Sequence, residues 1–144
     1  MTSRRVPRVL IDINVLIDVV EERVPWYRDS VALLDALSRG RGQGFLAGHS
    51  VTTLYYLAKK SNGHIAASTV VSDALALATV VPLTNADFLR ALSLGFKDFE
   101  DAVQVAAALQ AGCDFIATRN TIDFAGSPIP ALMPGVIAAR LSMA

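Results

Sequence analysis

An apolar run near the N-terminus, interrupted by one carboxylate and one carboxamide, constrains the fold of this chain more than any other stretch. It covers residues 8–18 and has the sequence RVLIDINVLID. A continuous apolar run predicts a buried strand, and residues 15–20 predict the helix that follows it. Ionic and amide groups are costly to bury without partners. We therefore expect Asp12 and Asn14 to lie at a sheet edge, facing a group that they bind.

The composition favours one globular domain that spans residues 1–144. Hydrophobic residues make up 53% of the chain and charged residues 18%, which excludes a disordered segment. The mean hydropathy is +0.44, but charged residues and prolines interrupt every apolar stretch before it reaches the length of a spanning helix. We expect a cytoplasmic protein with no membrane segment. Its apolar excess is most easily explained by the interface of a homodimer.

Charge and cysteine content exclude several kinds of site. The single Cys113 excludes an internal disulfide and every multi-cysteine metal motif. Thirteen basic and thirteen acidic residues give a formal net charge of zero, so any binding of nucleic acid must use local patches. Lys59 and Lys60 are expected to be solvated, and to contact phosphate only if the fold brings them to an acidic crevice.

The rest of the chain alternates strand patterns with helix patterns. Helices are predicted at residues 28–38, 50–60, 65–76, 84–94 and 98–111 and from residue 134 onward. Further strands are predicted at residues 44–47, 79–83, 114–118 and 129–133. This alternation predicts a three-layer α/β/α fold around a central, mainly parallel sheet of four or five strands. Ligands of such sheets bind beyond the carboxyl ends of the strands, where Asp12, Asn14, Asn120 and Asp123 would project.

Two carboxylates share one side of the helix predicted at residues 98–111. Each residue turns an α-helix by about 100°, so Asp98 and Asp101 lie about 60° apart, whereas Glu100 points away and is expected in solvent. Acids are favoured in the first turn of any helix because they complement its dipole, so either aspartate alone carries little weight. The stripe that faces the core is predicted to contain Phe99, Ala102, Val103, Ala106 and Leu109.

Counted together, four aspartates indicate a cation site. Asp12 and Asp123 each follow a predicted strand, and Asp98 and Asp101 flank the same crevice. Converging carboxylates repel one another unless protons or cations offset their charge, and Mg²⁺ or Mn²⁺ is the usual partner of oxygen-only ligands. This chemistry favours phosphoryl transfer.

Other polar residues are expected to have ordinary structural roles. His49 and His64 have no companions at metal-ligand spacing, so we expect them at a helix cap or on the surface. Asp18 is most simply explained as the solvated end of the first helix, although it lies one turn from Asn14 and would be able to contribute. The chain has no Gly-Lys-Ser/Thr loop, no Gly-x-Ser-x-Gly motif and no Gly-x-Gly-x-x-Gly motif after a strand.

Three segments resemble the acidic motifs of PIN domains. They are LIDINVLID at residues 10–18, GFKDFEDA at residues 95–102 and TRNTIDF at residues 118–124. They occur in the family's order and cover nearly the whole chain. By pattern, the chain is most similar to the prokaryotic single-domain members, which include VapC-like toxins of toxin-antitoxin pairs.

The resemblance implies a metal-dependent ribonuclease that leaves a 5′-phosphate and a 3′-hydroxyl. Asp12, Asp101 and the turn that contains Asn120 and Asp123 would hold one or two Mg²⁺ or Mn²⁺ ions, with Asp98 assisting. A bound ion lowers the pKa of water toward about 7 and orients the scissile phosphate. The implied partners are RNA and a small antitoxin protein. The implied supporting residues are Asn14, which would orient Asp12, and Arg119.

One position departs from the family pattern. Family members generally carry another acid on the helix after the second strand, where this chain has SVTTLYY at residues 50–56. The equivalent residue is Thr53, or Tyr55 in a second register, and neither supplies a negative charge at neutral pH. Two functions therefore remain open. One is an endoribonuclease for single-stranded or looped RNA, and the other is a catalytically degenerate module that binds RNA or protein.

Overall fold

A five-stranded parallel sheet forms the centre of the structure, a computed structural model that describes residues 5–143. The strands are β1 (Arg8–Ile11), β2 (Gln43–Ala47), β3 (Ala78–Val81), β4 (Phe115–Ala117) and β5 (Ala131–Leu132). Their order across the sheet is β3-β2-β1-β4-β5, and every neighbouring pair is parallel. The predicted sheet is thus confirmed, and β1 lies at its middle.

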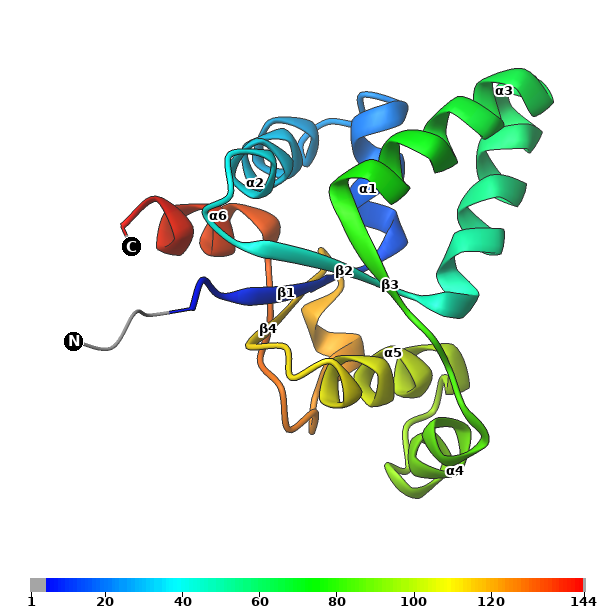
Figure 1. Cartoon of the computed structure of the whole chain (residues 1–144), viewed down its shortest axis with the longest axis vertical. Coiled ribbons are helices and arrows are strands. Elements are labelled where there is room, and N and C mark those ends of the chain that lie inside the picture. The colour runs from blue at the N-terminus through cyan, green and yellow to red at the C-terminus, as the bar shows by residue number, and fades with distance from the viewer. Residues whose placement is uncertain (1–4, 144) are drawn as a thin grey trace.

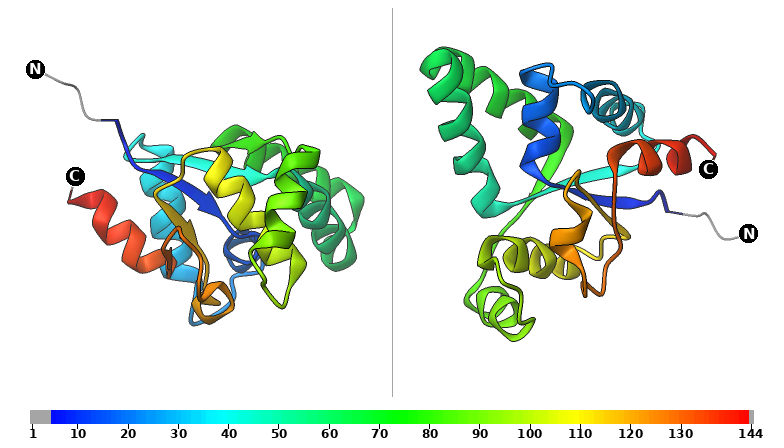
Figure 2. Two further views of the ribbon diagram at one scale, coloured as in Figure 1. Left: turned by 90° about the horizontal axis from the view of Figure 1, so that it is seen from below. Right: turned by 180° about the vertical axis from the view of Figure 1, so that it is seen from behind.

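Helices cover both faces of this sheet, which confirms the predicted three layers (Figures 1 and 2). In Figure 1, one layer lies above the sheet and the other below it. The upper layer contains α1 (Ile13–Val20), α2 (Tyr27–Ser38), α3 (Gly48–Leu77) and α6 (Pro134–Ser142). The lower layer contains α4 (Asn85–Ser93) and α5 (Phe99–Gln110), and the 3₁₀ helix η1 (Thr121–Phe124) follows β4. No helix within residues 5–143 is long and apolar enough to cross a membrane.

The central position of β1 in the sheet explains why its sequence is continuously apolar. Val9 and Ile11 pack into the core beneath α1, α2 and α3, whereas Leu10 packs on the opposite face against α5. All three are fully buried, as expected for a parallel strand covered on both sides. Asp12 comes directly after this strand, and its backbone N–H donates to the carbonyl of Ala117 on β4 at 3.0 Å.

Helix α3 joins the two helices predicted at residues 50–60 and 65–76. Its backbone leaves helical geometry only at Gly63, where φ is 86° and ψ is 172°. The helix begins at Gly48 and has no side-chain cap. Figure 1 shows the two arms of α3 meeting at a sharp bend at the edge of the molecule.

One core prediction was wrong. Phe99 was expected in the buried stripe of α5, but it is 44% exposed and stacks on Phe88 of α4, with ring centroids 6.3 Å apart. Phe99 is the first residue of α5, where the edge of the helix meets α4 rather than the sheet.

Candidate active site

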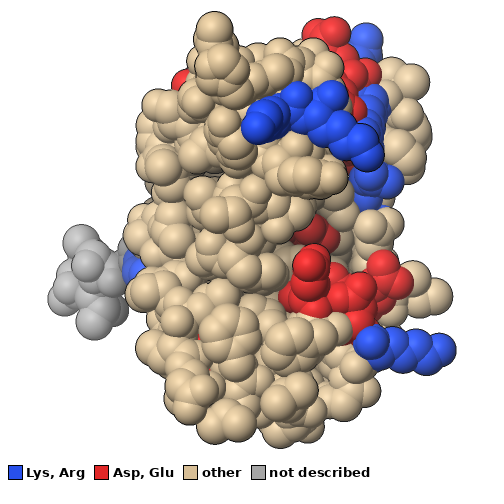
Figure 3. All heavy atoms as spheres, turned by 90° about the vertical axis from the view of Figure 1, so that its right-hand side faces the viewer, with Lys and Arg blue, Asp and Glu red and all other residues tan. Residues whose placement is uncertain are grey.

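A cavity of about 740 Å³ opens beyond the carboxyl ends of the central strands. Its walls come from α1, the first arm of α3, the start of α5 and the turn after β4. Figure 3 shows acidic side chains gathered on one side of this hollow. The cavity is lined by every residue predicted for the site: Asp12, Asn14, Thr53, Asp98, Asp101, Arg119, Asn120 and Asp123.

Asp12 is held at the base of the cavity by neighbouring side chains. It is 7% exposed and precedes the first residue of α1. Thr118 Oγ1 donates to Asp12 Oδ2 at 2.9 Å, and Asn14 Nδ2 donates to the same oxygen at 3.0 Å. Burial raises the pKa of Asp12, and the hydrogen bonds from Thr118, Asn14 and Gln104 partly offset that rise. The carboxylate is therefore fixed in place but incompletely stabilised.

Asp101 lies among like charges in the cavity. Burial, together with the negative charges of Asp98, Asp12, Asp123 and Glu100, raises its pKa to about 6. Asp98 precedes α5, and its Oδ1 accepts a hydrogen bond from the backbone N of Asp101 at 3.3 Å. A positive charge in the cavity would relieve this repulsion.

The donor chemistry fits a hard divalent cation. The acids supply only oxygen atoms, and the buried side-chain oxygens of Asn14 and Gln104 have no hydrogen-bond partner. As they stand in residues 5–143, no three His, Cys, Asp or Glu side chains are arranged to hold a metal ion. The residues thus fit Mg²⁺ or Mn²⁺ by the chemistry of their donor atoms and by their charge.

Asp18 was wrongly expected in solvent. It is fully buried, and its Oδ2 lies 2.9 Å from Arg119 Nε. The guanidinium carbon of Arg119 also lies 4.2 Å from the ring centroid of Trp26. Burial raises the pKa of Asp18, against the lowering effect of Arg119. This cluster fixes the turn that carries Asn120, because Arg119 precedes it directly.

The cavity is also lined by polar residues that were not predicted there, among them Glu100, His49 and Gln104. Glu100 is exposed, as expected, yet it shares the cavity with Asp101 rather than pointing away. His49 lines the cavity, and burial lowers its pKa. Gln104 is 5% exposed on α5, and its signal in the sequence was a lone carboxamide within an otherwise apolar helix stretch.

The wall formed by α3 contains no carboxylate. Thr53 does face the cavity, and its hydroxyl donates to the carbonyl of His49 at 3.3 Å. The other lining residues of this wall are His49, Ser50, Leu57, Lys60 and Ser61. The acids therefore come from the other walls.

Comparison with known proteins places this geometry in a family. A model of the PIN domain matches residues 8–122. Ribonuclease VapC1 of Aquifex aeolicus is 26% identical over 118 residues, which cover 78% of this chain and 81% of that protein.

Solved structures agree with that assignment. A toxin-antitoxin complex from Klebsiella pneumoniae contains a chain that is 26% identical, with a TM-score of 0.67 over 88% of this chain and 97% of that one. VapC20 of Mycobacterium tuberculosis, a sarcin-ricin loop cleaving toxin, shares the fold with 14% identity and a TM-score of 0.65. That match covers 81% of this chain and 93% of VapC20. With its sheet, its cavity and a match over residues 8–122, this chain belongs to the PIN domain family.

Proposed function

We propose that this protein is a divalent-cation-dependent endoribonuclease and the toxin of a toxin-antitoxin pair. The observation that carries the proposal is the convergence of Asp12, Asp98, Asp101 and Asp123 on one cavity, where burial and the charges of the neighbouring acids raise the pKa of Asp101 to about 6. Further support comes from the relative VapC1, which is a ribonuclease, and from the relative in a toxin-antitoxin complex.

The four aspartates would hold the cation, Mg²⁺ or Mn²⁺, between them. When bound, the cation lowers the pKa of water, orients the scissile phosphate and offsets charge on the leaving oxygen. Thr118 and Asn14 fix Asp12 through its Oδ2. Arg119 lines the cavity and offers N–H donors to a phosphate oxygen while Asp18 holds it in position.

The direct test compares wild-type protein with Asp12→Asn on single-stranded and looped RNA, in Mg²⁺ and in Mn²⁺. The wild type should cleave and leave 5′-phosphate ends, and Asp12→Asn should lose at least about a hundredfold in rate because the central oxygen ligand is weakened. Asp73→Asn, at an exposed position on α3 outside this cavity, is the matched control and should cleave like the wild type. Equal rates for wild type and Asp12→Asn, or no cleavage by either, would refute the proposal.

A second candidate function is a degenerate PIN module that binds RNA or protein without cleavage. Thr53 favours it, because no carboxylate comes from the α3 wall of the cavity. Thr53→Asp separates the two candidates. If Thr53→Asp cleaves RNA in Mn²⁺ and the wild type does not, the result favours the degenerate module. Stoichiometric Mn²⁺ binding by the wild type would count against the degenerate module.

The proposal extends to the assembly of the protein. We expect one domain over residues 1–144, a cytoplasmic location, a homodimer and an antitoxin partner. Residues 1–4 and 144 lie outside the described part of the chain. Co-expression with the product of a neighbouring gene, followed by co-purification, tests the partner.

A further inference from the structure

The cavity extends well beyond its acids. Helices α1 and the first arm of α3 both start at the carboxyl edge of the sheet, after β1 and β2. The residues that line the cavity extend from Asp12, before α1, to Glu21, after it, and from His49 to Ser61 along α3. At 1.5 Å per residue, Asp12 and Glu21 are separated by about 13 Å along α1, and His49 and Lys60 by about 16 Å along α3. One small anion therefore cannot contact both ends.

The far end of the cavity carries positive charge. Lys60 is exposed, and it forms no ion pair with any residue from 5 to 143. Arg23 donates through Nε and Nη2 to Glu21 Oε2, at 2.9 and 2.6 Å, which leaves its Nη1 free of that contact. Glu21 Oε1 accepts from Ser61 Oγ at 2.9 Å. The far end thus carries two cations and one carboxylate, and this carboxylate is already paired with Arg23 and orients its guanidinium.

An apolar strip separates the two ends. Ile17 of α1 and Leu57 of α3 line the cavity between Asn14 and Lys60. Figure 3 shows a group of Lys and Arg side chains above the hollow and a group of Asp and Glu side chains below it, with a further basic side chain beside the acids. The cavity thus has an acidic end that needs cations, an apolar middle and a basic end. This order matches the chemistry of a short nucleic-acid strand. Its phosphates are anionic, and its bases and riboses offer apolar contact.

We propose that Arg23 and Lys60 form a phosphate subsite that binds the RNA backbone a few nucleotides away from the bond to be cleaved. This inference rests on the proposed function, because the acidic end must accept the scissile phosphate. RNA is favoured over an acidic protein segment, since bases and riboses also fill the apolar strip formed by Ile17 and Leu57, which a run of acidic side chains would leave without apolar contact.

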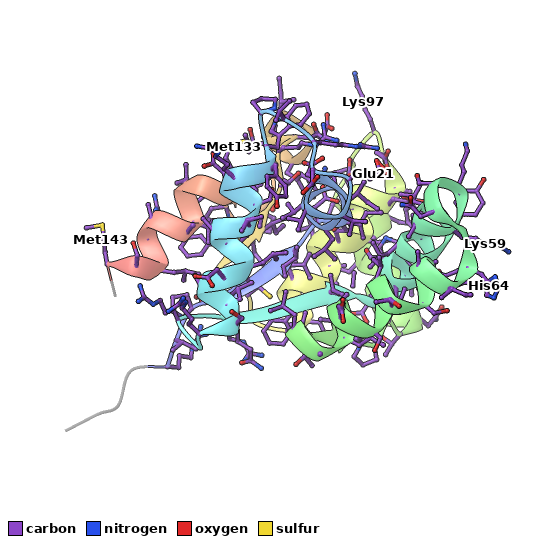
Figure 4. All side chains as sticks on the ribbon, turned by 90° about the horizontal axis from the view of Figure 1, so that it is seen from above. Glu21, Lys59, His64, Lys97, Met133 and Met143 are labelled. Atoms are coloured by element: carbon purple, nitrogen blue, oxygen red, sulfur yellow. The ribbon has the colours of Figure 1, made fainter. Side chains whose placement is uncertain are left out.

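The chain provides a matched control for this subsite. Lys59 neighbours Lys60 in sequence but does not line the cavity, and Figure 4 shows it on the outer side of α3. Lys59→Gln and Lys60→Gln remove the same charge from adjacent exposed positions of one helix. Any difference in RNA binding between the two variants therefore reflects the position of Lys60 in the cavity and not the net charge of the protein.

Binding is measured by fluorescence anisotropy with a labelled short single-stranded RNA, on protein that also carries Asp12→Asn so that the RNA stays intact. Lys60→Gln should raise the Kd about fivefold, the upper range for one exposed charge contact. It should also reduce the slope of log K against log salt by about 0.7, the value for one single-strand phosphate contact. Arg23→Gln should act similarly, and Lys59→Gln should change neither quantity. Equal effects of Lys59→Gln and Lys60→Gln would overturn the subsite.

Two further measurements separate this inference from the proposed function. Hydrolysis of bis(p-nitrophenyl) phosphate reaches only the acidic end and reports the nuclease centre alone, so the wild type and Lys59→Gln should hydrolyse it at equal rates, whereas Lys60→Gln should raise the KM for RNA. If the wild type hydrolyses neither substrate but RNA binding still depends on Lys60, the subsite stands and the nuclease proposal fails. If polyglutamate binds with the same dependence on Lys60 as RNA, the subsite is one for acidic protein, and the inference is overturned.

Discussion

Asp101 links the electrostatics of the cavity to the stability of the fold. Its pKa is raised from 3.8 to about 6 in the folded state. Between these two values the folded chain holds a proton that the unfolded chain has released, so the stability contributed by this group is lost as pH rises through that window. Above about pH 6, the cation-free protein is therefore destabilised by the repulsion between the ionised Asp101 and the other acids of the cavity.

Replacing Asp101 with Asn should stabilise the cation-free protein at neutral pH. The expected gain in the free energy of unfolding is about 1 kcal/mol near pH 7.5, after discounting for solvent screening, and it should vanish at about pH 3, below the window. Urea denaturation in EDTA at the two pH values measures it. Asp73→Asn, outside the cavity, should give no gain. A gain of equal size at both pH values would mean that the cause is not ionisation.

Single residues were predictable where the chain itself isolates them. Asp12 and Asn14 interrupt an apolar strand, and both line the cavity. Asp18 was not predictable, because its burial depends on Arg119, which is distant in sequence and approaches only when β4 pairs beside β1. Helical periodicity gave the angle between Asp98 and Asp101, but it did not give the width of the cavity, which Glu100 lines as well.

At the scale of elements, the sequence placed every strand to within a few residues, because parallel strands buried on both faces have uninterrupted apolar patterns. It also separated the two arms of α3. It did not show that α4 lies alongside α5, and for this reason Phe99 was assigned to the wrong surface. Amphipathic patterns identify an apolar face, and the element that covers it is decided by tertiary packing.

The bend in α3 depends on Gly63. Its φ of 86° with ψ of 172° lies in a region open essentially to glycine alone. Gly63→Ala should lower the free energy of unfolding by about 2 kcal/mol, measured in urea. Nothing lies within 4 Å of the position of an added Cβ, so the cost comes from the backbone and not from a clash. His64→Ala, at the adjacent exposed position, should change stability little, and equal losses in both variants would contradict this assignment.

At the scale of the whole molecule, a formal net charge of zero conceals a strong segregation of charge. Most of the acids gather at one end of the cavity, and Arg23 and Lys60 lie at the other together with Glu21. Composition averages over this arrangement, so it could not indicate where a polyanion binds. Part of the apolar excess lies on the surface of α4, where large side chains are exposed: Leu89 is 59% and Leu92 is 66% exposed.

The expected homodimer would be explained if this surface of α4 were covered by a second copy. Phe88 and Phe99 adjoin it, so the apolar surface continues onto the start of α5. Leu92→Glu would bury an unpaired carboxylate in such an interface and should convert the protein to a monomer, as measured by analytical ultracentrifugation over a range of concentrations. Leu75→Glu, at a 47% exposed position on the second arm of α3, is the matched control and should remain dimeric. A wild type that stays monomeric at every concentration, or dissociation caused only by Leu75→Glu, would exclude α4 as the interface.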